Sequence, residues 1–250
     1  MYVFSHLQKS AGTTITRILR RTFGLRHLDV MQNCGRYYTE KHLEYDIAHF
    51  INPYSIAGHC LRPHIDFGQY EDRMQWFSVI RDPLDRCISH YQHLIEKTDE
   101  NASFSEWIQR DTYRNLMVRF FGGTASVQKA IDSIHSKNMR VIVLSGQLEI
   151  DTQYIFSDSL CWRDLVANPG KSSRMKEEIK SSNIKMEALI SANELDLELF
   201  EYLKNTQCKP FDIIDGKLCA HPRLNSFLNM LYRNIIYRPV KKRLRNTGIR

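Results

Sequence analysis

Apolar residues follow two different spacings along the chain, and each spacing predicts one kind of secondary structure. Short runs of branched and aromatic residues predict β-strands, and these runs cover residues 2–4, 28–30, 54–59, 76–80 and 140–144. In the segments between them, apolar residues recur every three or four positions, which predicts helices. The helical segments begin near residue 15 and continue over residues 40–50, 84–94, 104–121, 126–135 and 175–204.

The alternation of strands with helices indicates an α/β fold whose central sheet is largely parallel and flanked by helices. The nearly continuous apolar run at 76–80 is typical of a strand that is buried on both faces of such a sheet. No repeat, low-complexity tract or linker interrupts the pattern, so we expect a single domain over residues 1–250. Parallel sheets bind ligands at the carboxyl ends of their strands. We therefore expect Lys9, His59 and Arg81, which all follow predicted strands, to meet at one edge.

The composition is that of an ordinary globular protein, with 42% hydrophobic and 25% charged residues. The net charge of +7 favours anionic partners of any kind, from nucleotides to acidic glycans and membrane surfaces. Six cysteines are scattered without C-x-x-C spacing, which argues against a zinc site or a disulfide framework. No window offers the roughly 20 apolar residues of a membrane span, and the N-terminus lacks a signal-peptide pattern. We expect a cytoplasmic protein.

The loop after the first predicted strand has the composition of an anion-binding site. Its seven residues are Gln8, Lys9, Ser10, Ala11, Gly12, Thr13 and Thr14. The small residues let the backbone curl closely around a ligand, and the threonines lie where the free amides of a helix N-terminus point. The alternative is an ordinary surface turn with a helix cap. Because Lys9 precedes the only glycine, the loop is not a Walker A motif, in which the lysine follows the second glycine.

A second candidate site begins where the apolar run at 76–80 ends. Arg81 carries a planar, permanently charged guanidinium that suits a phosphate, and Pro83 suits the first turn of a helix. Ser89 lies eight residues after Arg81, two helical turns along. The alternative is that Arg81 forms an ion pair with Asp82 or Asp85.

The two motifs together resemble sulfotransferases that use 3′-phosphoadenosine 5′-phosphosulfate (PAPS). The loop resembles their 5′-phosphosulfate-binding loop, in the Gln-Lys-x-x-Gly-Thr-[ST] form of the carbohydrate (heparan sulfate 2-O/6-O-type) enzymes. Residues 78–91 resemble their 3′-phosphate motif, R-D-P-x-x-R-x-x-S, and residues 115–122 and 193–200 are similar to two further family stretches, N-x-x-x-R-F-x-x-G and N-x-x-D-x-x-L-[YF]. The resemblance covers about residues 2–204 and leaves 205–250 as a C-terminal extension with a basic helix.

The resemblance implies a single P-loop-like domain and an O-sulfotransferase of the EC 2.8.2 type. Such an enzyme moves a sulfuryl group from PAPS to an acceptor hydroxyl, here on a carbohydrate or glycan, and releases adenosine 3′,5′-bisphosphate without needing a metal. Lys9 would contact the phosphosulfate bridge, and residues 10–14 would bind the 5′-phosphate. Arg81 and Ser89 would bind the 3′-phosphate. Ser173 and Arg174 match a loop that closes over the adenosine.

The same resemblance implies that His59 is the general base, because Gly58-His59 aligns with the glycine-histidine pair that supplies it in the heparan 2-O- and 6-O-sulfotransferases. A histidine near neutral pKa can accept a hydroxyl proton. Its place at a strand end favours His59 over the other candidates, which are His64, His90 and His93. Glutamate serves this role in some relatives, so Glu40 and Glu44 remain alternatives. The carbohydrate acceptor is implied by the resemblance alone, and a lipid or a small metabolite stays open as the acceptor.

Two other functional classes fit parts of the sequence. A P-loop-like nucleotide kinase would use Asp82 to hold Mg²⁺, although the R-D-P motif explains this residue better. A non-enzymatic module would bind an acidic glycan or nucleic acid through the basic tail, whose charges are Arg233, Arg238, Lys241, Lys242, Arg243, Arg245 and Arg250. We expect no nucleic-acid partner. The tail is either a basic amphipathic helix for an anionic membrane or a terminal helix that packs its apolar side on the domain.

Overall fold

The computed structural model describes residues 1–30, 37–50, 52–97, 102–144, 152, 156, 174–206 and 222–240. Its centre is a five-stranded sheet in the order β2-β3-β1-β4-β5, in which every neighbouring pair is parallel. The strands are β1 (Tyr2–Ser5), β2 (His27–Asp29), β3 (Ser55–Gly58), β4 (Gln75–Ile80) and β5 (Arg140–Val143). The predicted α/β fold with a parallel sheet is confirmed, and each predicted strand is present with small shifts at its ends.

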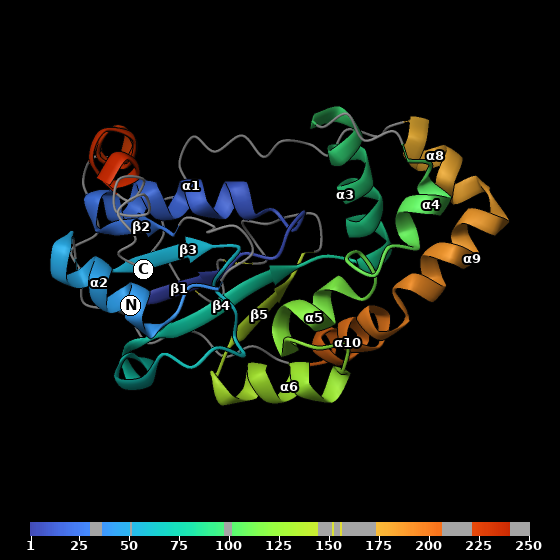
Figure 1. Ribbon diagram of the computed structural model, residues 1–250, viewed down its shortest axis with the longest axis horizontal. Coiled ribbons are helices and arrows are strands. Elements are labelled where there is room, and N and C mark those ends of the chain that lie inside the picture. The colour runs from blue at the N-terminus through green and yellow to red at the C-terminus, as the bar shows by residue number, and fades with distance from the viewer. Residues whose placement is uncertain are drawn as a thin grey trace.

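Helices cover both faces of the sheet and extend beyond its carboxyl edge (Figure 1). One face carries α1 (Gly12–Phe23), and the other carries α2 (Glu40–His49), α5 (Leu116–Gly122), α6 (Val127–Ser136) and α10 (Glu194–Lys204). A separate group stands at the end toward which the strands point (Figure 1), namely α3 (Pro83–Lys97), α4 (Phe104–Ile108), α8 (Arg174–Ser181) and α9 (Asn183–Ala192). Short 3-10 helices, η1 (Gly24–Arg26) and η2 (Gly68–Arg73), precede β2 and β4.

The helical pattern over 104–121 forms two helices rather than one. Ile108 ends α4, and α5 begins only after Asn115, whose φ of 47° lies in the left-handed region. A non-glycine residue with this φ does not belong to a continuing helix. The break between the two helices therefore spans residues 109–115 and ends with the left-handed backbone at Asn115.

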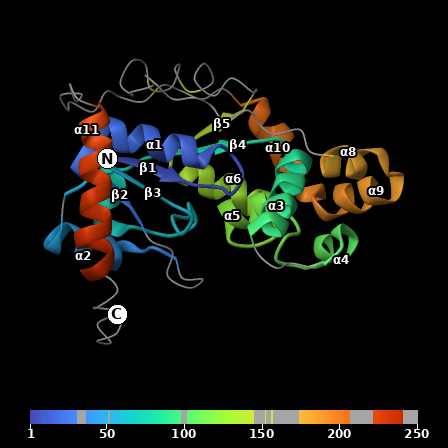
Figure 2. The ribbon, with the colours of Figure 1, turned by 90° about the horizontal axis from the view of Figure 1, so that it is seen from above.

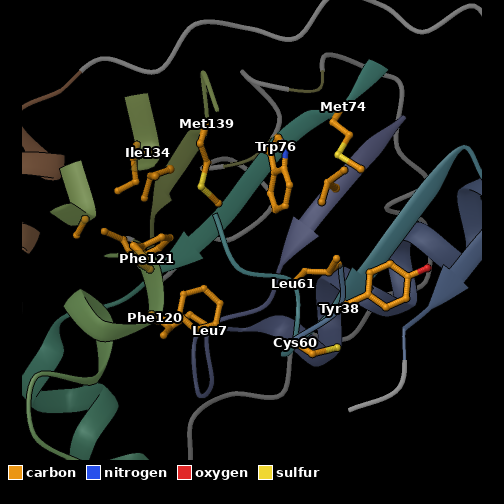
Figure 3. Close-up of a cluster of buried hydrophobic side chains, with 14 of the residues drawn as sticks. Leu7, Tyr38, Cys60, Leu61, Met74, Trp76, Phe120, Phe121, Ile134 and Met139 are labelled. Carbon is orange, nitrogen blue, oxygen red and sulfur yellow. The ribbon is translucent and has the colours of Figure 1, made fainter. Parts of the chain in front are cut away.

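Alternating side chains of the strands build two separate hydrophobic clusters. Tyr2 and Phe4 point toward α1, where they pack with Ile15 and other residues, whereas Val3 points to the opposite face. In β4 the same alternation sends Trp76 to the cluster on the opposite face, which Figure 3 shows. Each large apolar side chain that is fully buried in this way stabilises the fold by about 1.5–3 kcal/mol.

Two helices that are distant in sequence cap each other. The carboxylate of Asp196, in α10, accepts hydrogen bonds from the backbone amides of Met117 (2.9 Å) and Val118 (2.8 Å) at the start of α5. In return, Oδ1 of Asn115 accepts the amide of Leu195 at 3.0 Å. Both helix N-termini thereby receive the side-chain acceptor that their free amides require. The two family-like stretches at 115–122 and 193–200 meet at this contact.

The buried side chain of Arg86, in α3, also contacts Asp196. Its Nη2 lies 3.4 Å from Oδ2 of Asp196 and 3.5 Å from Oδ1 of Asn193, and Arg86 is only 1% exposed. Burial raises the pKa of Asp196, while Arg86 and the two amides of α5 lower it. The second arginine of the R-D-P-x-x-R motif is therefore a structural residue that ties α3 to α5 and α10.

The C-terminal helix covers the β2 edge of the sheet. It consists of α11 (Pro222–Leu231) and a π-helical continuation, η4 (Tyr232–Tyr237), and lies at one end of the molecule beside α1 (Figure 2). The side-chain amide of Asn229 donates to the carbonyls of Gly24 (2.8 Å) and His27 (2.9 Å), and Nη1 of Arg233 lies 3.2 Å from Oδ2 of Asp29.

The inner side of this helix is formed by polar and aromatic residues. Its most buried side chains are Asn229 and Tyr237, and the hydroxyl of Tyr237 donates to Oδ2 of Asp46 in α2 at 3.2 Å. The tail thus packs on the domain through Tyr232 and Tyr237, which join the hydrophobic cluster on that side, as well as through Asn229. Across the described ranges, none of the helices combines the length and the apolar character that crossing a membrane requires.

Replacing Asp196 with Ala should destabilise the protein by about 3–5 kcal/mol, because the change leaves Arg86 buried without its partner and removes the cap of α5. The measurement is urea unfolding followed by circular dichroism. The control is Asp132→Ala in α6, where an exposed carboxylate bonds only the side chain of Gln128 and the loss should stay below about 0.5 kcal/mol. Equal losses in the two variants would contradict the structural role given to Asp196.

Candidate active site

The loop between β1 and α1 turns back on itself through two residues in the left-handed region, Lys9 (φ 64°) and Ala11 (φ 56°). Ala11 is the N-cap of α1, and no side chain caps this end of the helix. The first turn of α1 contains no acidic residue. The positive end of the helix dipole and its free amides are therefore available to an anion that approaches the loop.

The imidazole of His6 lies against Gly12 and explains why a glycine starts α1. A Cβ at Gly12 would lie 1.5 Å from Nε2 of His6, so any larger residue would displace the ring or the loop. The next residue, Leu7, is fully buried in the same cluster as Phe120 and Phe121 of α5 (Figure 3). The loop is therefore fixed by the contact of Gly12 with the His6 ring and by the burial of Leu7 against α5.

Ser10 supports the interpretation of the loop as a ligand site. Its Oγ is fully buried and makes no hydrogen bond within the described part of the chain. Buried hydroxyl groups in folded proteins nearly always have a partner. An unpaired hydroxyl beside an uncapped helix N-terminus fits a loop that a ligand with acceptor oxygens completes.

Hydrogen bonds join the carboxyl ends of the three strands that carry the candidate residues. Oγ of Ser5, at the end of β1, donates to the carbonyl of Leu61 at 2.8 Å, and the carbonyl of Ser5 accepts Oγ of Ser78 from β4 at 2.7 Å. The amide of His6 donates to the carbonyl of Gly58 at the end of β3 at 3.2 Å. The segments that follow β1 and β3 are thereby fixed relative to the end of β4.

His59 follows β3 directly and contacts the loop after β1. Its Nδ1 lies 2.7 Å from the carbonyl oxygen of His6. A carbonyl can only accept, so Nδ1 carries the proton, and in the neutral ring Nε2 is the free acceptor. The two imidazole rings stack with their centroids 3.9 Å apart.

Burial keeps this histidine pair neutral. It lowers the pKa of His59, while the hydrogen bond to the His6 carbonyl raises that pKa and the charge of Arg62 lowers it. Burial, together with His59, lowers the pKa of His6 to about 3. Near pH 7, therefore, His59 presents an unprotonated Nε2 and His6 adds no charge beside it.

Arg81 lies at the end of β4 and has a weak ion pair with Asp85, as the structural alternative predicted. Its Nη2 is 3.4 Å from Oδ2 of Asp85. The same carboxylate also binds the ammonium groups of Lys176 (3.1 Å) and Lys180 (2.8 Å) in α8. Burial works to raise the pKa of Asp85, but these lysine hydrogen bonds lower it to about 2. Within the described residues this contact uses one of the five guanidinium donors of Arg81, so the others can bind a ligand.

The charges of these residues interact with one another at the carboxyl edge of the sheet. Burial lowers the pKa of Lys9, Glu96 raises it, and the nearby charge of Arg81 lowers it. In α3, burial lowers the pKa of His90 to about 4, and the charges of Arg86, Lys9 and His59 add to that effect. The structure thus brings Lys9, Arg81 and His59 to the same edge, as expected, and adds His90.

The remaining candidates differ in how they relate to this edge. Gln8 and Thr14 are half-buried in the loop and the first turn of α1, and Thr13 is exposed. Ser89 is half-buried in α3, and Arg174 is the exposed first residue of α8. Ser173 lies outside the described residues.

The alternative bases lie elsewhere. Nδ1 of His64 lies 3.3 Å from the carbonyl of Phe121 in α5. Glu40 and Glu44 each accept a hydrogen bond from Gln69, in η2. In the described part of the chain, the hydrogen bonds of these two carboxylates go to η2, and none joins either of them to His59.

Sequence reasoning did not single out His6. The signal was available, because His6 follows β1 as directly as His59 follows β3. What could not be seen is that the two residues stack, since this depends on the register that pairs Ser5 with Gly58. His90 is predicted only as a candidate base, whereas in the structure its ring packs edge-on against Trp107 and Tyr113.

A sequence model described as the sulfotransferase family matches residues 2–203. The chain belongs to the sulfotransferase family. The match extends from β1 to α10 and includes every described residue of the candidate site, while α11 lies outside it. The predicted family is therefore confirmed, and the protein is a transferase that moves a sulfuryl group. No curated protein matches the chain.

Gly12→Ala in this sulfotransferase should cost about 1–3 kcal/mol of unfolding free energy, because the new methyl overlaps the His6 ring. Chemical denaturation measures the loss. Introducing the same change into His6→Ala should cost less than about 0.5 kcal/mol, since the overlapping ring is gone and the two sites are coupled. If Gly12→Ala costs the same in both backgrounds, His6 is not the reason for the glycine.

Proposed function

We propose that this sulfotransferase moves a sulfuryl group from PAPS to a hydroxyl of a carbohydrate acceptor. Lys9, the N-terminus of α1 and Arg81 would bind the donor, and His59 would act as general base. One observation carries the proposal: Lys9, His59 and Arg81 follow the carboxyl ends of three adjacent parallel strands, β1, β3 and β4, and the hydrogen bond from Nδ1 of His59 to the His6 carbonyl leaves Nε2 as the acceptor. The carbohydrate acceptor is supported by the likeness of the Gln-Lys-x-x-Gly-Thr-[ST] loop to that of the heparan-type enzymes.

The two halves of the donor site have different tasks. The uncapped start of α1, with Ser10, Thr13 and Thr14, offers amides and hydroxyls to a 5′-phosphate. The guanidinium of Arg81, with Ser89 two turns along α3, suits a 3′-phosphate. The ion pairs of Asp85 with Lys176 and Lys180 join α8 to α3, and Arg174, the first residue of α8, would contact the adenosine.

PAPS, when bound, supplies the activated sulfuryl group on its 5′-phosphate. Lys9 would then lie near the bridging oxygen, where negative charge accumulates as the bond to sulfur breaks. A donor already positioned for that charge stabilises the transition state more than the ground state. The left-handed backbone at Lys9 and the packing of Leu7 fix the part of the loop from which this side chain extends.

His59 would remove the proton of the acceptor hydroxyl through Nε2. The carbonyl of His6 fixes the ring orientation and the tautomer, and it stabilises the imidazolium that forms. Because His6 stays neutral, it does not oppose the positive charge that His59 gains. His6 is thus a positioning residue for the base.

The kinase alternative requires a carboxylate at a strand end that is free to bind Mg²⁺. Asp82 is the candidate, and its Oδ1 accepts the backbone amide of Asp85 at 2.8 Å. This contact caps the start of α3 and gives Asp82 a structural task. We therefore do not favour a kinase.

Isothermal titration with adenosine 3′,5′-bisphosphate tests the donor site. We expect tight binding in the presence of EDTA, and a loss of about 10- to 100-fold in Arg81→Ala, because a charged hydrogen bond to the 3′-phosphate is missing. Adenosine 5′-phosphosulfate, which lacks the 3′-phosphate, should bind both forms alike. The control is Arg73→Ala, an exposed arginine at the opposite edge of the sheet. Equal weakening toward both nucleotides would remove Arg81 from the 3′-phosphate site.

The pH dependence of kcat/KM tests His59, with an acceptor found by thermal-shift screening of glycans against the bisphosphate complex. Burial places the pKa of His59 below its ordinary value of about 6.5. Activity should therefore be full at neutral pH and fall as acid protonates the ring. His59→Ala should lower kcat by about 10²–10⁴, abolish this acidic limb and leave bisphosphate binding intact.

The matched control is His49→Ala, an exposed histidine of α2, which should keep both rate and profile. A well-folded His59→Ala protein that retains the acidic limb would show that another group is the base.

A further inference from the structure

The outer side of the C-terminal helix exposes a row of large apolar side chains. Its members are Leu224 (52% exposed), Phe227 (51%), Met230 (43%), Ile235 (66%) and Ile236 (48%). We call these five residues the outer face. The opposite side of the same helix contacts the domain through Asn225, Asn229 and Tyr237. The helix thus buries Asn229 and Tyr237 against the domain, while the five side chains of the outer face point away from it.

This concentration of apolar surface is unusual for the molecule. Among the described residues, eleven large hydrophobic side chains are exposed, and five of them form the outer face. Single exposed apolar residues need no explanation, whereas a row of them on one helix marks a surface that is covered by something else.

The charge of the protein is concentrated in the same segment. Residues 216–250 contain nine of the 35 Lys and Arg residues and none of the 28 Asp and Glu residues, so residues 1–215 have a net charge of −2 and the segment has +9. Arg238 is exposed directly after the outer face. Lys241, Lys242 and Arg243 follow in the sequence. The apolar row thus leads into a purely cationic stretch.

We propose that the outer face is a docking surface for an anionic lipid bilayer, with the positive charge of the segment that carries it as the source of attraction. Large apolar side chains on one side of a helix enter the boundary between headgroups and acyl chains, and adjacent Lys and Arg residues are attracted to anionic headgroups. A soluble polyanion would neutralise the charges but would leave the five apolar side chains in water. The charge and the apolar row together therefore favour a membrane surface over a nucleic acid or an acidic glycan.

This surface is separate from the candidate active site. The outer face lies on α11 and η4, beside the β2 edge, whereas Lys9 and Arg81 lie at the carboxyl edge of the sheet. Binding of adenosine 3′,5′-bisphosphate should consequently be the same in every variant below. Vesicle binding therefore tests the docking surface, and bisphosphate binding tests the donor site independently of it.

Co-sedimentation of the full chain with vesicles tests the proposal. We expect binding to phosphatidylcholine vesicles that contain about one third phosphatidylglycerol, and none to pure phosphatidylcholine. The double variant Phe227→Glu/Ile235→Glu should partition at least tenfold more weakly, because it removes two apolar side chains and adds two negative charges. Lys241→Gln/Lys242→Gln/Arg243→Gln should bind about a hundredfold more weakly, from about 1 kcal/mol for each charge.

The matched control is Ile184→Glu in α9, a side chain that is 78% exposed at the opposite end of the molecule (Figure 2). It should bind vesicles like the wild type.

Melting curves establish that each variant is folded, and the triple Gln variant tests the proposal if the Glu variants unfold. Three results would overturn it: wild-type protein that stays free of anionic vesicles, a folded Phe227→Glu/Ile235→Glu protein that binds undiminished, or equal weakening by Ile184→Glu. Binding to heparin without vesicle binding would instead indicate a polyanion partner.

Discussion

The hydrogen bonds at the end of β1 are the contacts on which the candidate site depends. Ser5 donates to the segment after β3 and accepts from Ser78 of β4, and the next residue, His6, bonds both Gly58 and His59. The central strand thus holds the carboxyl ends of both its neighbours. Each of the three strands carries one part of the site. Since all the strands are parallel, their carboxyl ends meet at one edge, and a shift of one residue in register would separate Lys9 from His59.

Burial determines the protonation of the site as much as charge does. Lys9 and Arg81 bring positive charge to this edge, which suits a donor with several negative charges. Burial is the largest cause that lowers the pKa values of His6, His59 and His90; the charge of Arg62 adds to it at His59, and those of Arg86 and Lys9 add to it at His90. The edge can therefore carry cations and still hold a neutral base. In water, a histidine with its ordinary pKa would be partly protonated near neutral pH.

The strands and the two phosphate motifs could be predicted because their signals are local. Lys9 and Arg81 each follow an apolar run, and a short window contains the evidence for both. The tasks of Arg86, Asn115 and Asp196 could not be predicted in this way, because each depends on a partner about 80 to 110 residues away. Arg81 and Arg86 belong to one motif. Only the direction of α3 shows that the second is buried against Asp196 while the first faces the site.

The reciprocal caps of α5 and α10 have a consequence for the order in which the chain folds. The amides of Met117 and Val118 find their acceptor only in Asp196, which is synthesised about 80 residues later. Closing so long a loop costs chain entropy before any contact repays it. On the ribosome, we therefore expect α5 to emerge without its cap and to pack firmly against Leu7 only after α10 has left the exit tunnel. We infer that folding of the carboxyl edge of the sheet is coupled to α10, the last helix within the matched region.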